Sequence, residues 1–296
     1  MSKELLSTVL RVVKLPLYYM LYQGVFSVVA MIVAFCVAIA NGCITQEMLL
    51  AGDTAAVMSA LPQSYMVWAI SGGLFVSAAF MLWHLIFWGY FSFGKEPFRQ
   101  VPGKVMLLCV LLIFASMFAF NILAEELGLP DTLAETLQQV SNNVLGCVSI
   151  AVLAPILEEV LFRGAIQGYL MRKYNPTVGI VVASAIFGLI HMNPIQIFYA
   201  FFLGLIFGWI YYRTRSLMPV VIGHVLNNSL AAASMILAGA EEEEEALMSM
   251  AEKGAIVLAA VVAAFVLMRL IGRLLPAVPK PWRGVGECEP EGCENI

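Results

Sequence analysis

The stretch from Asn143 to Leu170, NVLGCVSIAVLAPILEEVLFRGAIQGYL, decides the fold and the site. Its length and apolar composition are typical of a membrane-spanning helix, because about 20 apolar residues cross a bilayer. It nevertheless carries two carboxylates, Glu158 and Glu159, and the guanidinium of Arg163. A charge near the bilayer centre costs about 2.5–3.5 kcal/mol on insertion scales, so these three side chains are expected to face protein or water rather than lipid.

The rest of the chain has the composition of a membrane protein. Of its 296 residues, 61% are hydrophobic and only 12% are charged, whereas about a quarter of the residues of soluble domains are charged. No basic patch suggests nucleic acid, and the bilayer itself is the expected partner. Apolar stretches predict an all-α, polytopic bundle of about eight transmembrane helices, at 17–41, 64–91, 104–124, 143–168, 177–192, 194–212, 217–238 and 254–275.

The basic residues predict the orientation of these spans. With the N-terminus inside, all 16 Lys and Arg residues except Lys253 fall on or beside cytoplasmic connections. Both termini are therefore predicted to be cytoplasmic, in an integral membrane protein. We divide the chain into an interfacial amphipathic helix at 1–16 ending at Pro16, a membrane core at 17–275, and a disordered cytoplasmic tail at 276–296.

The spacing of the charged residues separates the two glutamates. Glu159 and Arg163 are four residues apart with the acid first, the better order for a helical ion pair. Glu158 points about 100° away and keeps no such partner, so it is the candidate general base. Pro155 removes a helical hydrogen bond to the carbonyl of Ala151 and can kink the helix there.

Two of the three histidines occur on later spans. His191 follows Phe187 by four residues near the end of the short span 177–192, and His224 precedes Asn228 by four residues on the span 217–238. Three spans thus carry two imidazoles, an amide and an unpaired carboxylate. This combination is more typical of a functional site than of unrelated buried residues. The pairs Asn175-Pro176 and Asn193-Pro194 are predicted to begin helices.

Three motifs in this order resemble the CPBP family of intramembrane proteases, which includes the CAAX prenyl endopeptidases and bacterial proteins linked to bacteriocin self-immunity. The motifs lie within residues 143–232 and are Glu158-Glu159-x-x-x-Arg163, Phe187-x-x-x-His191 and His224-x-x-x-Asn228. The resemblance implies that Glu158 and His191 activate a water and that His224 and Asn228 complete the catalytic site. Glu159, Arg163 and Phe187 would hold these residues in position without contacting the substrate. The resemblance also favours a location in the bacterial cytoplasmic (inner) membrane.

The residues and the family agree on peptide hydrolysis, which needs a water, a base and donors aimed at the developing oxyanion. The expected function is an intramembrane endopeptidase acting on a membrane-associated peptide or protein, of metalloprotease or glutamate type. The alternative is a catalytically silent scaffold or immunity protein that binds a peptide partner. A transporter is disfavoured because the polar residues occupy only three spans and no repeat is present.

The sequence leaves open whether the site uses a metal ion. Two neutral imidazoles near a carboxylate are a natural divalent site, so Zn²⁺ held by His191, His224 and Glu158 is one expectation. The other is a metal-free, glutamate-based hydrolysis by the same side chains, since the sequence contains no His-Glu-x-x-His helix. The sequence does not indicate the oligomeric state or the identity of the substrate.

Overall fold

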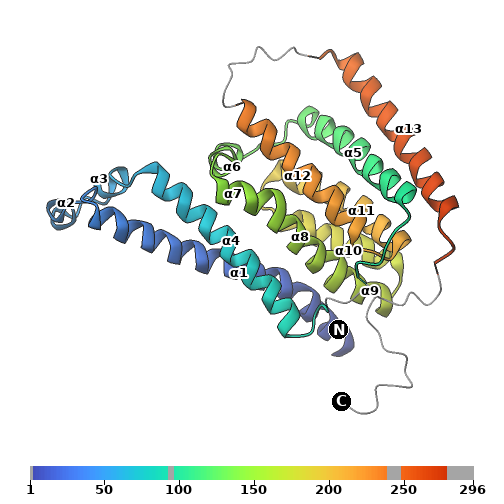
Figure 1. The fold of residues 1–296 in the computed structure, drawn as a ribbon, viewed down its shortest axis with the longest axis horizontal. Helices are drawn as coiled ribbons and strands as arrows, with labels where there is room; N and C mark the ends of the chain where they lie inside the picture. Colours follow the sequence, from blue (N-terminus) through green and yellow to red (C-terminus); the bar gives the residue numbers. More distant parts are fainter. Residues whose placement is uncertain (1–2, 93–96, 239–247, 279–296) are drawn as a thin grey trace. The chain divides into compact units, whose positions relative to one another are not determined.

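The computed structural model describes residues 3–92, 97–238 and 248–278, and every regular element among them is helical (Figure 1). The predicted tail at 276–296 and the acidic run Glu241–Glu245 lie wholly or largely outside these residues. The helices are α1 (Lys3–Ala40), α2 (Gln46–Ala51), α3 (Thr54–Ser59), α4 (Gln63–Phe87), α5 (Gly103–Glu126), α6 (Ala134–Ser141), α7 (Val144–Val148), α8 (Ala154–Glu158), α9 (Gly168–Lys173), α10 (Pro176–Leu189), α11 (Pro194–Thr214), α12 (Met218–Ala238) and α13 (Met250–Leu274), with two π-helices, η1 (Ser149–Leu153) and η2 (Glu159–Gln167).

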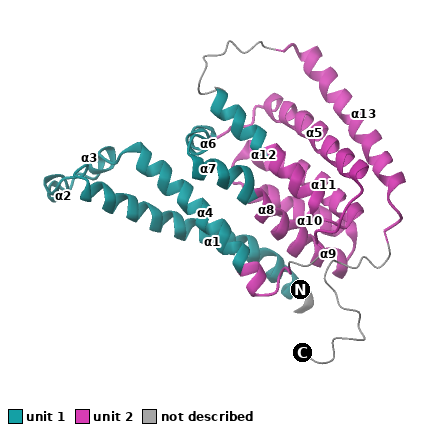
Figure 2. Ribbon diagram, viewed as in Figure 1, with its two compact units in different colours: residues 1–83, 134–154, 228–242 teal, residues 84–133, 155–227, 243–296 magenta. Residues whose placement is uncertain are grey.

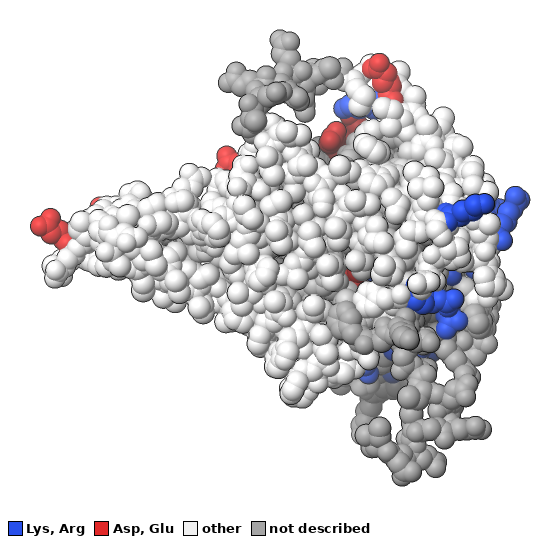
Figure 3. All heavy atoms as spheres, viewed as in Figure 1, with Lys and Arg blue, Asp and Glu red and all other residues white. Residues whose placement is uncertain are grey.

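The helix lengths confirm the prediction of a polytopic membrane bundle. Within the described residues, seven helices are long and apolar enough to cross a bilayer, and α10 is a shorter apolar helix of 14 residues. At 1.5 Å per residue α10 extends about 21 Å, less than the roughly 30 Å of a hydrocarbon core. Most of the face drawn in Figure 3 is uncharged, as expected of a surface that meets lipid, and the charged side chains in view lie mainly near its edges.

The first helix differs from the prediction. The interfacial helix was expected to end at Pro16, but α1 continues through this proline to Ala40 as one helix of 38 residues. A proline inside a helix removes one hydrogen bond, which neighbouring packing can offset. Here Val12, Leu15 and Tyr19, on either side of Pro16, are all buried. The packing around Pro16 therefore holds the helix continuous.

The chain divides into two compact units (Figure 2). The first contains residues 1–83, 134–154 and 228–242. Within it, α1 and α4 are joined through the short helices α2 and α3, and the buried side chains at this end are Ala38, Ile44, Val57 and Leu61. The side-chain amide of Asn41 donates to the hydroxyl of Tyr65 at 2.9 Å. Apolar burial and this hydrogen bond from the turn after α1 to α4 thus close the hairpin.

The second unit contains residues 84–133, 155–227 and 243–296. Helix α13 packs on α5, α5 packs on α11, and α11 packs on α10, which in turn contacts η2 and α9. The polar π-helix η2 is therefore surrounded by other helices of its unit, and all of its residues but Gly164 are buried. This packing lets a membrane protein keep a charged helix away from lipid.

The turn between α10 and α11 is fixed by an unpredicted contact. Asn175 caps α10 as expected, since its side chain accepts a hydrogen bond from the backbone N–H of Val178. Asn193 precedes α11 but does not cap it. Instead it is fully buried, accepts from the backbone N–H of Thr132 at 3.1 Å and donates to the carboxylate of Asp131 at 2.9 Å. The turn that carries His191 is thereby tied to the loop after α5.

Candidate active site

Two π-helical segments flank the short helix α8, which ends at Glu158. In η1 the backbone N–H of Ala154 donates to the carbonyl of Ser149, and after η2 the N–H of Gly168 donates to the carbonyl of Arg163. Both bonds span five residues instead of four. Short π-helical turns occur frequently at functional sites because they re-aim the side chains of an otherwise regular helix.

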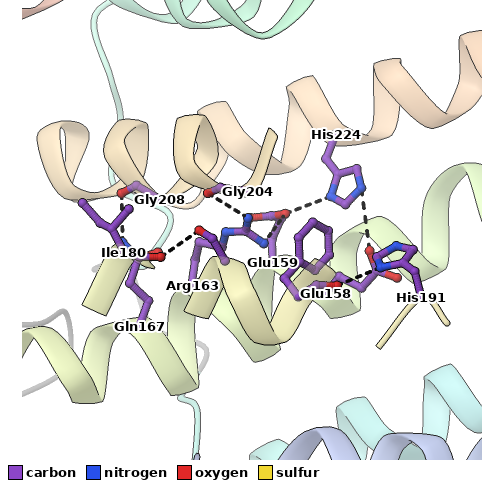
Figure 4. Close-up of polar contacts among 11 residues, drawn as sticks. Glu158, Glu159, Arg163, Gln167, Ile180, His191, Gly204, Gly208 and His224 are labelled. Carbon is purple, nitrogen blue, oxygen red and sulfur yellow. Dashed lines mark hydrogen bonds and ion pairs between the residues drawn. The ribbon is translucent and has the colours of Figure 1, made fainter. Parts of the chain in front are cut away.

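The two adjacent glutamates are placed in different surroundings (Figure 4). The side chain of Glu159 is completely buried, whereas that of Glu158 keeps 12% of its surface accessible. A fully buried carboxylate needs charged or hydrogen-bonding partners, while a partly accessible one can meet a substrate or water. The structure therefore distinguishes a fully buried carboxylate, Glu159, from a partly accessible one, Glu158.

Glu159 accepts from two cationic or potentially cationic side chains. Its Oε1 lies 3.2 Å from Nη1 of Arg163, which confirms the predicted ion pair, and 2.8 Å from Nδ1 of His224. The link to His224 was not predicted, because no spacing within one helix can reveal a partner 65 residues away. One carboxylate oxygen thus joins η2 to α12 within the same unit.

Arg163 is enclosed by aromatic rings and by a backbone carbonyl. Its Nη2 donates to the carbonyl of Gly204 at 3.3 Å, and its guanidinium carbon lies 4.5 Å from the ring centre of Phe187 and 5.2 Å from that of Phe207. Cation–π contacts of this kind offset part of the desolvation of a buried guanidinium. The side chain is only 1% exposed, so solvent does not reach it.

His224 stands between the two glutamates. Its Nε2 lies 3.7 Å from Oε2 of Glu158, so the expectation that Glu158 has no facing partner was wrong. Because the carboxylate of Glu159 can only accept, the proton on the Nδ1 side belongs to the imidazole. In its neutral form His224 therefore presents an unprotonated Nε2 toward Glu158, and it can donate from Nε2 only as the imidazolium.

His191 has the same tautomer for a different reason. It lies in the turn just after α10, and its Nδ1 donates to the carbonyl of Phe187 at 2.8 Å. Its ring packs edge-on against the ring of Phe187, which also contacts His224 at a centroid distance of 5.9 Å. Phe187 thus holds both imidazoles, and each directs its Nε2 away from its supporting hydrogen bond.

Asn228 is placed differently from the other predicted site residues. It lies four residues beyond His224 on α12 but belongs to the first compact unit. Its side-chain amide donates to the backbone carbonyl of Ile150 in η1 at 3.0 Å. The structure thus gives the amide a backbone partner, and the expected role of Asn228 as an oxyanion donor stays a prediction.

Several supporting residues were missed by the sequence analysis. Gln167, four residues after Arg163, is completely buried and donates to the carbonyl of Gly208 at 2.9 Å, just as Arg163 donates to Gly204. A Cβ at Gly208 would lie 2.9 Å from Oε1 of Gln167, so a larger residue there would require the end of this buried side chain to shift. Both pairs recur at a spacing of four residues, which is the signal that could have revealed them.

The expected zinc ligands can be compared with this geometry. Among the residues that the structure describes, no three His, Cys, Asp or Glu side chains converge closely enough to hold a metal ion. His224 and Glu158 face each other, and a zinc site needs a third protein ligand at similar range. The arrangement does not present a ready three-ligand set, so zinc binding stays a prediction.

Comparisons with known proteins match this segment of the chain. Residues 140–230 match the family model "Rce1-like: Type II CAAX prenyl endopeptidase Rce1-like". A Bacillus subtilis (strain 168) protein named "Putative membrane peptidase YdiL" is 30% identical over 79 residues. That alignment covers 27% of this chain and only 32% of the relative. No solved structure matches the chain.

The family match covers the elements that build the site. Residues 140–230 include α7, α8, η2, α10, α11 and the part of α12 that carries His224 and Asn228. Helices α1 to α5 and α13 lie outside it. In this segment the chain is similar to the Rce1-like CAAX prenyl endopeptidases and to a protein named as a membrane peptidase, as the three motifs suggested.

Proposed function

We propose that this protein is an intramembrane endopeptidase that hydrolyses a peptide bond of a membrane-associated peptide or protein. The observation that carries the proposal is the pairing of an accessible carboxylate, Glu158, with an imidazole, His224, that a buried carboxylate orients. A structural ion pair would need only Glu159 and Arg163. The additional facing pair beside it is what a hydrolytic site requires.

In the proposed reaction Glu158 is the general base. It removes a proton from a water molecule, whose oxygen attacks the carbonyl carbon of the scissile peptide bond. The unprotonated Nε2 of His191 accepts the second hydrogen of this water and orients it. Glu158, now protonated, then delivers its proton to the amine that leaves when the C–N bond breaks. All steps use side chains of this chain and one water.

His224 contributes by its charge in this scheme. Its Nδ1–H is held by Glu159, so a proton taken up at Nε2 gives an imidazolium that faces the reacting centre. Such a cation stabilises the negative charge that develops on the substrate oxygen. If Zn²⁺ were held by His191, His224 and Glu158, it would supply this stabilisation and would activate the water. Zinc analysis of the purified protein distinguishes the two variants of the proposal.

The test is a comparison of membrane and secreted peptides by mass spectrometry, in cells that carry wild type, Glu158→Gln or no copy of the protein. A peptide cleaved only by wild type is the expected result. Glu135→Gln on α6 is the matched control, because Glu135 is an exposed glutamate. Cleavage that persists in Glu158→Gln would refute the mechanism. A different outcome is that the peptides are the same in all strains and a peptide is captured bound to the protein. That result would favour a catalytically silent scaffold or immunity protein.

A further inference from the structure

The hydrogen bond between Asn228 and Ile150 lies within the first compact unit and joins α12 to the π-helix η1. A backbone carbonyl inside a helix normally accepts from an N–H of its own helix. A side-chain donor from another helix is therefore informative, because a buried carbonyl whose intrahelical donor is missing needs such a partner. The carbonyl of Ile150 is expected to lack a donor from its own helix.

The cause is the hydrogen-bond register of η1 together with the proline that follows it. In η1 the N–H of Ala154 donates to Ser149, five residues earlier. The next donor in this register would be residue 155, paired with the carbonyl of Ile150. Residue 155 is proline and has no N–H. The π register thus moves the unsatisfied carbonyl from Ala151, where an α-helix would leave it, to Ile150.

We infer that Pro155 and Asn228 form a single positioning device, in which the proline opens the carbonyl of Ile150 and the amide of Asn228 closes it from α12. The helical run continues from Ile150 through α8 to Glu158, eight residues later. On α12 the same amide is one turn from His224. The device therefore fixes the two helices that carry the facing pair, and its consequence for catalysis rests on the proposed function.

This role differs from the one that the sequence suggested for Asn228. An oxyanion donor would act on substrate alone, so its removal would reduce turnover whatever residue occupies position 155. A positioning residue that closes a carbonyl becomes dispensable when the helix regains its own donor. Pro155→Ala supplies that donor, because an alanine N–H can reach Ile150 in the π register, and in a restored α register Ala154 reaches it.

The experiment is a double-mutant cycle of Asn228→Ala and Pro155→Ala in the full chain, reconstituted in lipid. Asn228→Ala alone is expected to shift the unfolding equilibrium about three- to twentyfold toward the unfolded state, the range of interhelical hydrogen bonds in membranes. Adding Pro155→Ala should recover most of this shift. Additive effects of the two substitutions would overturn the inference. If Asn228→Ala cannot be isolated folded, a folded double variant supports the device and an unfolded one overturns it.

Turnover provides the second measurement, with a peptide whose cleavage depends on wild type. The lowered kcat of Asn228→Ala should rise again in the double variant, with KM unchanged. Recovered stability without recovered kcat would overturn the positioning role. Ser234→Ala, an exposed serine on α12 that bonds only locally to Ala231, is the control and should be additive with Pro155→Ala. The stability cycle can be read even if Glu158→Gln shows no effect on cleavage, so the two proposals fail separately.

Discussion

Two apolar helical segments of the second unit differ in where their charged side chains lie and in how deeply these are buried. The run α8–η2 (Ala154–Gln167) buries Glu159 and Arg163 completely in its middle. Helix α13 keeps its charges near its ends and leaves most of its surface exposed, with 11% of its apolar window buried. Its Lys253 pairs with Glu126 of α5 at 2.6 Å, yet both side chains remain partly exposed.

This contrast shows that the position of a charge along a membrane helix decides what the charge indicates. A charge at the end of a membrane helix reaches the interface and costs little, so it indicates orientation only. A charge in the middle must be solvated by the protein. For Arg163 this means one carboxylate, one backbone carbonyl and two aromatic rings. The same carboxylate also holds His224, so this costly arrangement supports the proposal that the segment positions a functional group.

The largest expected effect tests whether α8–η2 carries chemistry. Glu158→Gln keeps the size of the side chain but cannot accept a proton at neutral pH, so kcat should fall by roughly 10²–10⁴-fold. The protein should insert and remain folded, because Glu158 is not a partner of the buried ion pair. Cleavage assays with purified protein in lipid measure the first expectation and thermal unfolding the second. Loss of folding instead of activity would remove the distinction between the two glutamates.

The next effect concerns stability. Replacing Arg163 by leucine leaves the carboxylate of Glu159 buried with one partner fewer, and should cost about 3–5 kcal/mol if the site stays dry. The double variant Arg163→Leu, Glu159→Gln should recover part of the loss, since neither charge then remains. Denaturant unfolding in lipid–detergent mixtures measures wild type, the single variants Arg163→Leu and Glu159→Gln, and the double variant. Absence of coupling in this cycle would contradict the ion pair.

Much of this arrangement was predictable from local patterns. Apolar length gave the membrane helices, and the spacing of four residues gave the pair of Glu159 and Arg163, which the structure confirms. The cap of α10 by Asn175 was also predictable, because it involves residues three positions apart. Each of these predictions depends on neighbours in sequence, where helix geometry fixes the distance.

The parts that failed depend on packing between distant segments. The partner of His224 on another helix, the buried contact of Asn193 with Asp131, and the continuation of α1 through Pro16 were not predicted. The π-helical register was missed as well, because propensity rules assume the four-residue bond. Tertiary contacts decide all four features, and a single sequence does not display them.

A smaller effect compares glycines of the two helix environments. Gly208→Ala should destabilise by about 1–3 kcal/mol, because its Cβ would meet Gln167 and Ile180 at 2.9 and 3.0 Å. Gly254→Ala on α13 is the matched control, since nothing lies within 4 Å of the added Cβ. There alanine should stabilise by up to about 1 kcal/mol through helix propensity. Equal effects at both positions would show that the close approach of α11 to η2 is wrong.

The smallest expected effect is at the charged end of α13. Lys253→Ala removes the ion pair with Glu126, and because both side chains are partly exposed the loss should be about 0.2–1 kcal/mol. High salt should reduce it further, since screening weakens an accessible pair and hardly affects a buried one. The measurement is the free energy of unfolding of wild type, Lys253→Ala and Arg163→Leu at low and high salt. If the Lys253 pair proved as strong and as insensitive to salt as the Arg163 pair, burial would no longer explain why α8–η2, unlike α13, surrounds its charges with protein.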